Sequence, residues 1–343
     1  MGRDLTFYPK EATKDELKQF IESLGFTKCD HLWDWPKGTL NYQWFDFEDF
    51  KSIDGVSADI YPVNKEDNIF NNNEWAIHVR NLYSASIYDV QMMNKVLREA
   101  RKLFGGTITG DYGTNRYAPL WEDKSTPISR GIQWVYNKIF YAMEAISKTL
   151  PDETIQFQAT DGVKMKMLND FVKQYDPSRV LYNGLVPFLI SMFEYFFSES
   201  FQILIKYDDT TKENIKQHSQ KIDFQTLIEV SKNERTIENI IAGNYIFQNL
   251  NQLNKAYKEW LNIDVRKILF RKKKLGKSIN YLENRIAEII QYRHGIIHRF
   301  ELDLNLSKED FIVLVETVKL AIDEVINFLE NKYAMQIERD RYE

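Results

Sequence analysis

Near residue 128 the spacing of the apolar residues changes, and this change constrains the fold more than any other feature of the sequence. Before it, aromatic and β-branched runs at 41–47, 56–63 and 75–83 are separated by turn residues, a pattern typical of antiparallel strands. After it, apolar residues recur at steps of three and four, which is the period of a helix. A chain of 343 residues also exceeds the usual size of a single domain, so we expect two domains of different class.

The N-terminal part, residues 1–128, is predicted to be an α+β domain. Thr13 and Glu16 form the sequence signature of a capping box at the start of a helix over 12–24. A second helical pattern covers 86–104, and a short strand is expected after it. Helices and strands in one short segment indicate a two-layer arrangement. We expect this domain to have a sensory or regulatory role.

The C-terminal part, residues 129–343, is predicted to be an all-α helical bundle. Helical patterns cover 132–150, 163–175, 179–205, 235–260, 278–299 and 308–333. The most apolar stretch, 181–205, is long enough to cross a membrane, but Pro187, Glu194 and Glu199 interrupt it, and charges are costly in lipid. We therefore predict the buried central helix of a soluble domain and no membrane association.

Composition excludes several classes of protein. A formal net charge of −5 argues against nonspecific coating of nucleic acid, which usually needs a net basic surface. The single cysteine, Cys29, excludes an internal disulfide and a multi-cysteine zinc site. The first residues contain no apolar segment typical of a secretory signal. These observations favour a cytoplasmic location.

The segment 291–300, with the sequence QYRHGIIHRF, places polar residues at the end of an apolar helical pattern. The apolar positions before it are Ile279, Leu282, Ile286, Ile289 and Ile290. Continuing their phase predicts an inward-facing Arg293, His294, Ile297 and His298, with Ile297 as the remaining core contact. Gly295 weakens a helix, so local loosening is expected to let Arg293 and His298 converge. Buried polar residues in such a position indicate a site or a partner-facing surface.

Arg293 and His298 have the chemistry needed to cleave a phosphodiester without a metal. A guanidinium is permanently charged and binds phosphate oxygens in pairs, so Arg293 suits the charge of a pentacoordinate transition state. An imidazole titrates near neutrality, so His298 suits proton transfer to or from the reacting oxygens. The nucleophile would be the 2′-hydroxyl of RNA itself.

The run from Arg293 to Arg299, RHGIIHR, resembles the R-x4-6-H signature of HEPN domains, and in particular the branch whose motif reads RHxxVHR, with Ile297 in place of valine. The resemblance implies an all-helical HEPN-like bundle and a metal-independent endoribonuclease, with Arg293 and His298 as catalytic residues in a composite site between two copies of a homodimer. It also implies a supporting role for His294. Glu194, on the helix resembling the first long HEPN helix, is the expected partner of Arg293 or a histidine.

The same resemblance implies a role as a toxin or antiviral defence effector that cleaves RNA, with an antitoxin or regulatory partner as a further expectation. A basic run that includes Lys272, Lys273 and Lys274, together with Arg299 of the motif, is the expected contact for RNA phosphates. An ordinary solvated surface explains the lysine run equally well. The alternative to the enzyme is a catalytically silent HEPN-like scaffold for dimerisation or interaction.

Two other interpretations fit the sequence less well. His294 and His298 have the i, i+4 spacing of zinc ligands, but Gly295 stands where a zincin has glutamate, and no third ligand is evident. The segment that begins at Gly105 has the outer glycine spacing of a P-loop, but Asp111 replaces its lysine and a helical pattern precedes it. We therefore expect neither a metal nor a cofactor.

Overall fold

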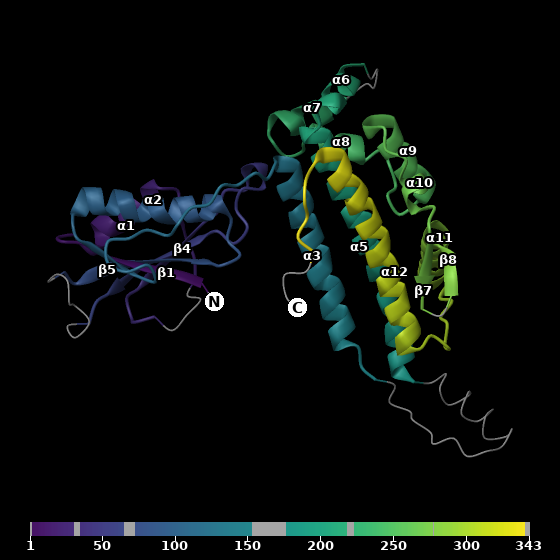
Figure 1. Cartoon of the computed structure of the whole chain (residues 1–343), viewed down its shortest axis with the longest axis horizontal. Helices are drawn as coiled ribbons and strands as arrows, with labels where there is room; N and C mark the ends of the chain where they lie inside the picture. Colours follow the sequence, from purple (N-terminus) through teal and green to yellow (C-terminus); the bar gives the residue numbers. More distant parts are fainter. Residues whose placement is uncertain are drawn as a thin grey trace, which may run out of the picture. The chain divides into compact units, whose positions relative to one another are not determined.

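The computed structural model describes residues 2–30, 35–64, 73–152, 176–217, 223–276 and 278–339. The chain divides into two compact units, Met1–Arg130 and Gly131–Glu343. The first is a mixed α/β unit with an antiparallel sheet, and the second is helical (Figure 1). The helix expected at 163–175 lies outside the described residues.

The first unit is a six-stranded sheet with two helices on one face (Figure 1). Its elements are β1 (Gly2–Tyr8), α1 (Lys14–Ser23), β2 (Thr27–Lys28), β3 (Leu40–Trp44), the 3-10 helix η1 (Glu48–Phe50), β4 (Val56–Pro62), β5 (Trp75–Leu82), α2 (Ile87–Phe104) and β6 (Thr107–Gly110). The strand order is β2-β3-β4-β5-β1-β6, and every described pairing is antiparallel. The sequence pattern predicts no strand over 2–8, yet β1 lies inside the sheet between β5 and β6.

Alternation along β1 separates an apolar core from a polar face. Leu5 and Phe7 are fully buried in the core beneath α1 and α2. On the opposite face, Thr6 pairs with His78 of β5, and the Thr6 hydroxyl lies 3.3 Å from His78 Nδ1. His78 Nε2 lies 3.1 Å from Asp4 Oδ1. Burial lowers the pKa of His78 to about 4, although the Asp4 carboxylate opposes this shift and Arg80 adds to it.

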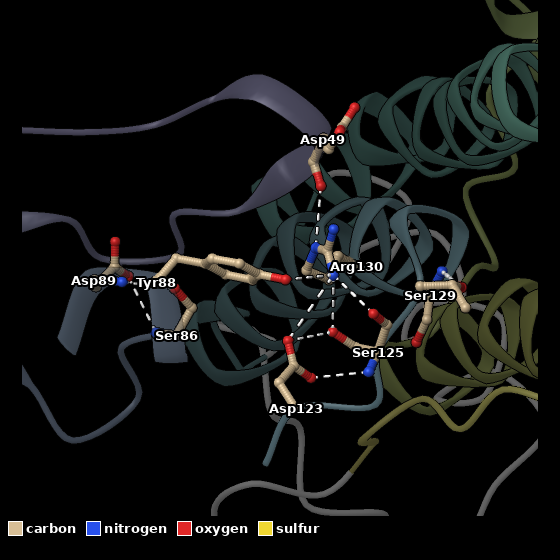
Figure 2. Close-up of polar contacts among 9 residues, drawn as sticks. Asp49, Ser86, Tyr88, Asp89, Asp123, Ser125, Ser129 and Arg130 are labelled. Carbon is tan, nitrogen blue, oxygen red and sulfur yellow. Dashed lines mark hydrogen bonds and ion pairs between the residues drawn. The ribbon is translucent and has the colours of Figure 1, made fainter. Parts of the chain in front are cut away.

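Side-chain caps fix where the helices of the first unit begin. The predicted capping box is confirmed, because Thr13 accepts from the Glu16 N–H and Glu16 accepts from the Thr13 N–H. Ser86 and Asp89 form an equivalent box at the start of α2 (Figure 2). These capping hydrogen bonds therefore set the residue at which each helix begins.

Arg130, in the first turn of α3 (Pro127–Thr149), is held by a set of contacts within the first unit (Figure 2). Its Nε donates to the Asp49 carbonyl at 3.0 Å, and its Nη1 donates to the Ser125 carbonyl at 2.8 Å. The guanidinium also lies 5.1 Å from the ring centroid of Tyr88 and 3.9 Å from Asp123 Oδ2. With only 11% of its side chain exposed, Arg130 fixes the start of α3.

In the described part of the second unit, the elements are helices and one hairpin. After α3 come α5 (Pro177–Tyr207), α6 (Asp209–Gln217), α7 (Phe224–Ser231), α8 (Ile237–Ala242), α9 (Leu250–Leu261), α10 (Val265–Leu269), β7 (Lys272–Leu275), β8 (Ser278–Tyr281), α11 (Leu282–Arg299) and α12 (Lys308–Tyr333). Figure 1 shows α3, α5 and α12 lying along one another. Side chains join them, because Lys138 donates to Tyr195 and Lys319 lies over the ring of Phe140.

The central helix is α5, as predicted from its apolar sequence. It contacts α8, α9, α11 and α12 and buries an aromatic cluster that includes Phe193, Phe196 and Phe197. Among the described residues, α5 is the one helix long and apolar enough to cross a membrane. Its packing against the other helices is consistent with a soluble protein.

Two predicted helices are wrong in extent. The segment 235–260 forms two helices, α8 and α9, because Gly243 ends the first and the Asn249 side chain caps the second. Residues 278–281 do not begin α11 but form β8, which pairs with β7. Ile279 is consequently 69% exposed and is no part of the core stripe.

Candidate functional site

The last two turns of α11 carry the predicted motif, but only part of it faces the core. The buried residues Leu282, Ile286 and Ile289 are separated by alternating steps of four and three, and the next positions in this series are Arg293 and Ile296. Ile296 is buried and Arg293 is half-buried. The helix thus keeps its packing phase to the end.

The predicted inward orientation is therefore wrong for three of the four residues. His294 and His298 are exposed, and Ile297 is 47% exposed instead of being a core contact. Residues 294, 297 and 298 lie beside the stripe, since adjacent positions on a helix differ by about 100° around the axis. The polar residues of the motif are accordingly available at the surface of a single chain.

Arg293 is the motif residue most influenced by its surroundings. Its Nε is buried and has no hydrogen-bond partner among the residues that the structure describes. Glu194, on α5, lies close enough for its pKa to respond to the Arg293 charge. Burial raises the pKa of Glu194 above its usual value, and the guanidinium partly opposes that rise. The expected association of Glu194 with Arg293 is thus present as an electrostatic interaction, while a supporting role in catalysis stays a prediction.

The two histidines form a pair one helical turn apart. The ring centroids of His294 and His298 are 4.4 Å apart, with an angle of 46° between the rings. Across the described parts of the chain, no group of three His, Cys, Asp or Glu side chains is arranged to hold a metal ion. The pair is suited to proton transfer or to contacts with a ligand at the surface.

Gly295 has a different role from the one predicted. The helix α11 is continuous through it, so it does not loosen the backbone. Instead the chain turns back at Phe300, which has a φ of 55°, and the Glu301 N–H donates to the Gly295 carbonyl at 3.2 Å. A Cβ on residue 295 would lie 2.8 Å from Glu301 Oε2. Gly295 therefore leaves room for the side chain of Glu301.

An unbroken helix keeps Arg293 and His298 apart within one chain. Five residues correspond to a rise of about 7.5 Å and a rotation of about 140° beyond one full turn. Arg293 points toward the packed side near α5, whereas His298 is exposed. The expected convergence of the two side chains through local loosening is therefore not observed.

Residues that the motif does not include fix the end of α11. The Tyr292 hydroxyl bonds to Asn183 Oδ1, and the Asp303 N–H donates to the same oxygen at 2.8 Å. Asn183 Nδ2 in turn donates to the Asp303 carbonyl at 2.9 Å. Burial raises the pKa of Tyr292 to about 12. Asn183 is fully buried. A polar side chain within the apolar run 181–205 is the feature of the sequence that indicates such a connection.

A groove of about 550 Å³ runs along the same end of α11. It is lined by Ala287, Glu288, Gln291, Tyr292, Gly295, Arg299 and Glu301. Arg299, a predicted RNA contact, lies 3.2 Å from Glu301 in an exposed ion pair between Nε and Oε1. A phosphate would compete with that carboxylate for the guanidinium.

The three lysines of the predicted basic run lie on β7 of the β7–β8 hairpin, and they have different surroundings. Lys273 Nζ lies 2.5 Å from Glu324 Oε1, and Arg271 Nη1 lies 3.0 Å from Glu324 Oε2. Glu324 is only 5% exposed, so these two cations neutralise a buried carboxylate. Lys273 is therefore structural, whereas Lys272 and Lys274 are exposed. The run contains no acid in sequence, but the fold supplies one from α12.

Comparisons with known proteins identify no similar protein. The chain matches no protein-family model, no curated protein sequence and no solved structure. The features that bear on function are therefore the motif on α11 and the residues of α5 that contact it.

Proposed function

We propose that the second unit is a metal-independent endoribonuclease of the HEPN type that acts as a homodimer. The observation that carries this proposal is the difference in burial between Arg293 and His298, which lie on one continuous helix. Arg293 is half-buried with an unpartnered Nε among the described residues, and His298 is exposed. In this proposal Arg293 binds the anionic phosphate, and the exposed His298 transfers protons.

A dimer resolves the separation of these two residues. Because one helix directs Arg293 and His298 about 140° apart, a phosphodiester between two copies would meet the arginine of one and the histidine of the other. Ile297 and Phe300 add exposed apolar surface beside the motif, with 47% and 79% exposure. Apolar surface of this kind is common where protein chains associate.

The proposed reaction needs no external nucleophile. The 2′-oxygen of RNA forms a bond to phosphorus while the bond from phosphorus to the 5′-oxygen breaks. His298 of one copy takes the proton of the 2′-hydroxyl and, once protonated, gives a proton to the leaving 5′-oxygen. Arg293 stabilises the charge on the phosphoryl oxygens. The products are a 2′,3′-cyclic phosphate and a 5′-hydroxyl.

Cleavage of cellular or invading RNA by such an enzyme suits a cytoplasmic toxin or antiviral defence effector. In that role the first unit would be a sensory or regulatory domain, and an antitoxin or another regulatory partner would hold the nuclease silent. The RNA-binding residues of the proposal are Lys272, Lys274 and Arg299.

A catalytically silent scaffold is the second candidate. The observation that favours it is the position of Glu194, whose charge interacts with Arg293 and would oppose the approach of a phosphate. A protein of this kind would form the same dimer without cleaving RNA. Activity therefore separates the two candidates, while the mass in solution tests the dimer that they share.

The test is incubation of the purified full-length chain with mixed RNA in EDTA. Arg293→Ala and His298→Ala are expected to lower cleavage by about a hundredfold or more. Matched controls lie on the same helix: Arg285→Ala removes an arginine that is paired with Glu288, and His294→Ala removes the neighbouring exposed imidazole. Arg285→Ala should retain full activity, and His294→Ala should lose less than His298→Ala. Equal activity in all variants would exclude the proposed site.

A further inference from the structure

The β7–β8 hairpin has two faces with opposite properties. In its register, Lys272 pairs with Tyr281 and Lys274 pairs with Ile279, so these four side chains share one face. On that face Lys272, Lys274 and Ile279 are exposed and Tyr281 is half-buried. On the other face Leu275 is buried and Lys273 is bound to the buried Glu324. We name the first set, together with Phe270, the outer face of the hairpin.

Aromatic rings on the outer face are stacked and open to solvent. The ring centroids of Phe270 and Tyr281 are 4.5 Å apart, with an angle of 13° between the rings. Phe270 is nevertheless 58% exposed and Ile279 is 69% exposed. One side of Phe270 is covered by Tyr281, and with 58% of the side chain exposed the ring still offers surface to a further flat ring. Contiguous exposed apolar surface marks an interaction site in many proteins.

Positive charge surrounds these rings. Lys272 Nζ lies 5.4 Å from the Tyr281 ring centroid, and Lys274 lies two residues along the same strand. The outer face, as far as the structure describes it, carries no carboxylate, since the nearby acid Glu324 is occupied by Arg271 and Lys273. A stacking surface flanked by exposed lysines is what proteins use to bind single-stranded nucleic acid.

We infer that the outer face of the β7–β8 hairpin binds single-stranded RNA. A base stacks on the open side of Phe270, and Lys272 and Lys274 contact the adjacent phosphates. The identification of RNA as the strand rests on the proposed function, whereas the stacking and charge arguments do not. Duplex RNA does not fit, because its bases are already stacked and paired and cannot reach a flat ring.

The location of this face sets a length for the substrate. Tyr281 directly precedes α11, and the sixteen steps from Leu282 to His298 correspond to a rise of about 24 Å. A fully stacked strand advances roughly 3.4 Å per nucleotide and a more extended strand advances further, so at most about seven nucleotides separate the hairpin from the proposed cleavage site. Strands much shorter than this reach only one of the two and should be cleaved with a higher KM.

Binding is measured in the His298→Ala background, so that the RNA stays intact. Fluorescence anisotropy with a labelled single strand of about 12 nucleotides is expected to show roughly tenfold weaker binding for Phe270→Leu, because the lost stacking is worth about 1–3 kcal/mol per base. The ring-preserving Phe270→Tyr should bind normally. Lys272→Gln with Lys274→Gln should reduce the slope of log K against log salt by about 1.4, since each single-strand phosphate contact contributes about 0.7. Lys267→Gln, an exposed lysine of α10 outside the face, is the control.

The two proposals fail in different ways. Unchanged RNA binding by Phe270→Leu, or equal binding of duplex RNA, would overturn the inference even if cleavage depends on His298. Absence of cleavage by the wild-type chain, with binding still lost in Phe270→Leu, would remove the proposed nuclease and leave the binding face. A change from dimer to monomer in Phe270→Leu, without a change in RNA affinity, would identify the face as an interface between copies and also overturn the inference.

Discussion

The most quantitative prediction concerns His78 and the stability of the first unit at mildly acidic pH. Burial lowers the pKa of His78 from 6.5 to about 4, even with the Asp4 carboxylate 3.1 Å away. Desolvation therefore outweighs the attraction of the carboxylate, and the folded protein holds the imidazole neutral. The unfolded chain takes up the proton near pH 6.5, so lowering the pH favours the unfolded state.

The size of the effect follows from these two pKa values. The stabilisation is fully present above pH 6.5 and is lost as the pH falls toward 4. Between pH 7.5 and pH 5 the free energy of unfolding should fall by about 2 kcal/mol through this residue alone, at 1.36 kcal/mol per pKa unit. His78→Gln keeps a polar side chain but cannot titrate, so it should lack this component of the pH dependence.

The measurement is urea unfolding at pH 7.5 and pH 5, followed by tryptophan fluorescence. Five of the seven tryptophans precede residue 131, so the signal reports mainly on the first unit. The wild-type chain should lose about 2 kcal/mol more than His78→Gln between the two pH values. An NMR titration should place the midpoint of the His78 imidazole near 4. Parallel pH dependences for the two proteins, or a midpoint near 6.5, would show that burial does not control this histidine.

Three further predictions concern stability alone, each measured as the free energy of unfolding in urea. Gly295→Ala should be neutral or stabilising by about 0.5 kcal/mol, because alanine favours a helix and its Cβ needs only the flexible end of Glu301 to move. A loss of stability above about 1 kcal/mol would contradict this reasoning. Lys273→Met should lower the free energy of unfolding by about 1–2 kcal/mol, because it removes one of two cations from a buried carboxylate. Lys272→Met should lower it by no more than about 0.5 kcal/mol. Equal losses would mean that the two faces of the hairpin do not differ as described. Arg130→Met should cost about 2–3 kcal/mol through lost charge-assisted hydrogen bonds, and an unchanged stability would show that these bonds contribute nothing net.

Local signals in the sequence predicted the helix starts well. Thr13 accepts the backbone N–H three residues on, as the capping-box signature indicates. The change from an α/β unit to a helical one was also readable, because strand and helix spacings differ over many residues. Both features depend on short-range geometry that the sequence itself encodes.

Contacts between distant residues were not readable in the same way. Nothing in the basic run indicates that Glu324, about fifty residues later, separates Lys273 from Lys272 and Lys274. Strand β1 was missed because only Leu5 and Phe7 in it are strongly apolar, and its polar alternate residues pair with a face that only the assembled sheet creates. Such features are products of tertiary structure.

The candidate site shows both situations in one helix. Arg293 follows the alternating four and three spacing of the buried residues and could be placed from the sequence. The sequence places His294, Ile297 and His298 on the same face only if the apolar stripe of the helix is widened by one position in each turn. Over the last turns of α11 that small angular error changes a buried site into a surface one.

The alternation along β7 also makes three successive lysines chemically different. Lys272 and Lys274 present their amines to solvent, whereas the amine of Lys273 is held against Glu324. Acylation of the outer two would remove positive charge and leave the carboxylate of α12 neutralised. Acylation of Lys273 would break its ion pair and leave Arg271 as the remaining cation beside Glu324. For any modifying enzyme or amine reagent, a single-residue step along this strand separates a change in surface charge from a change in folding stability.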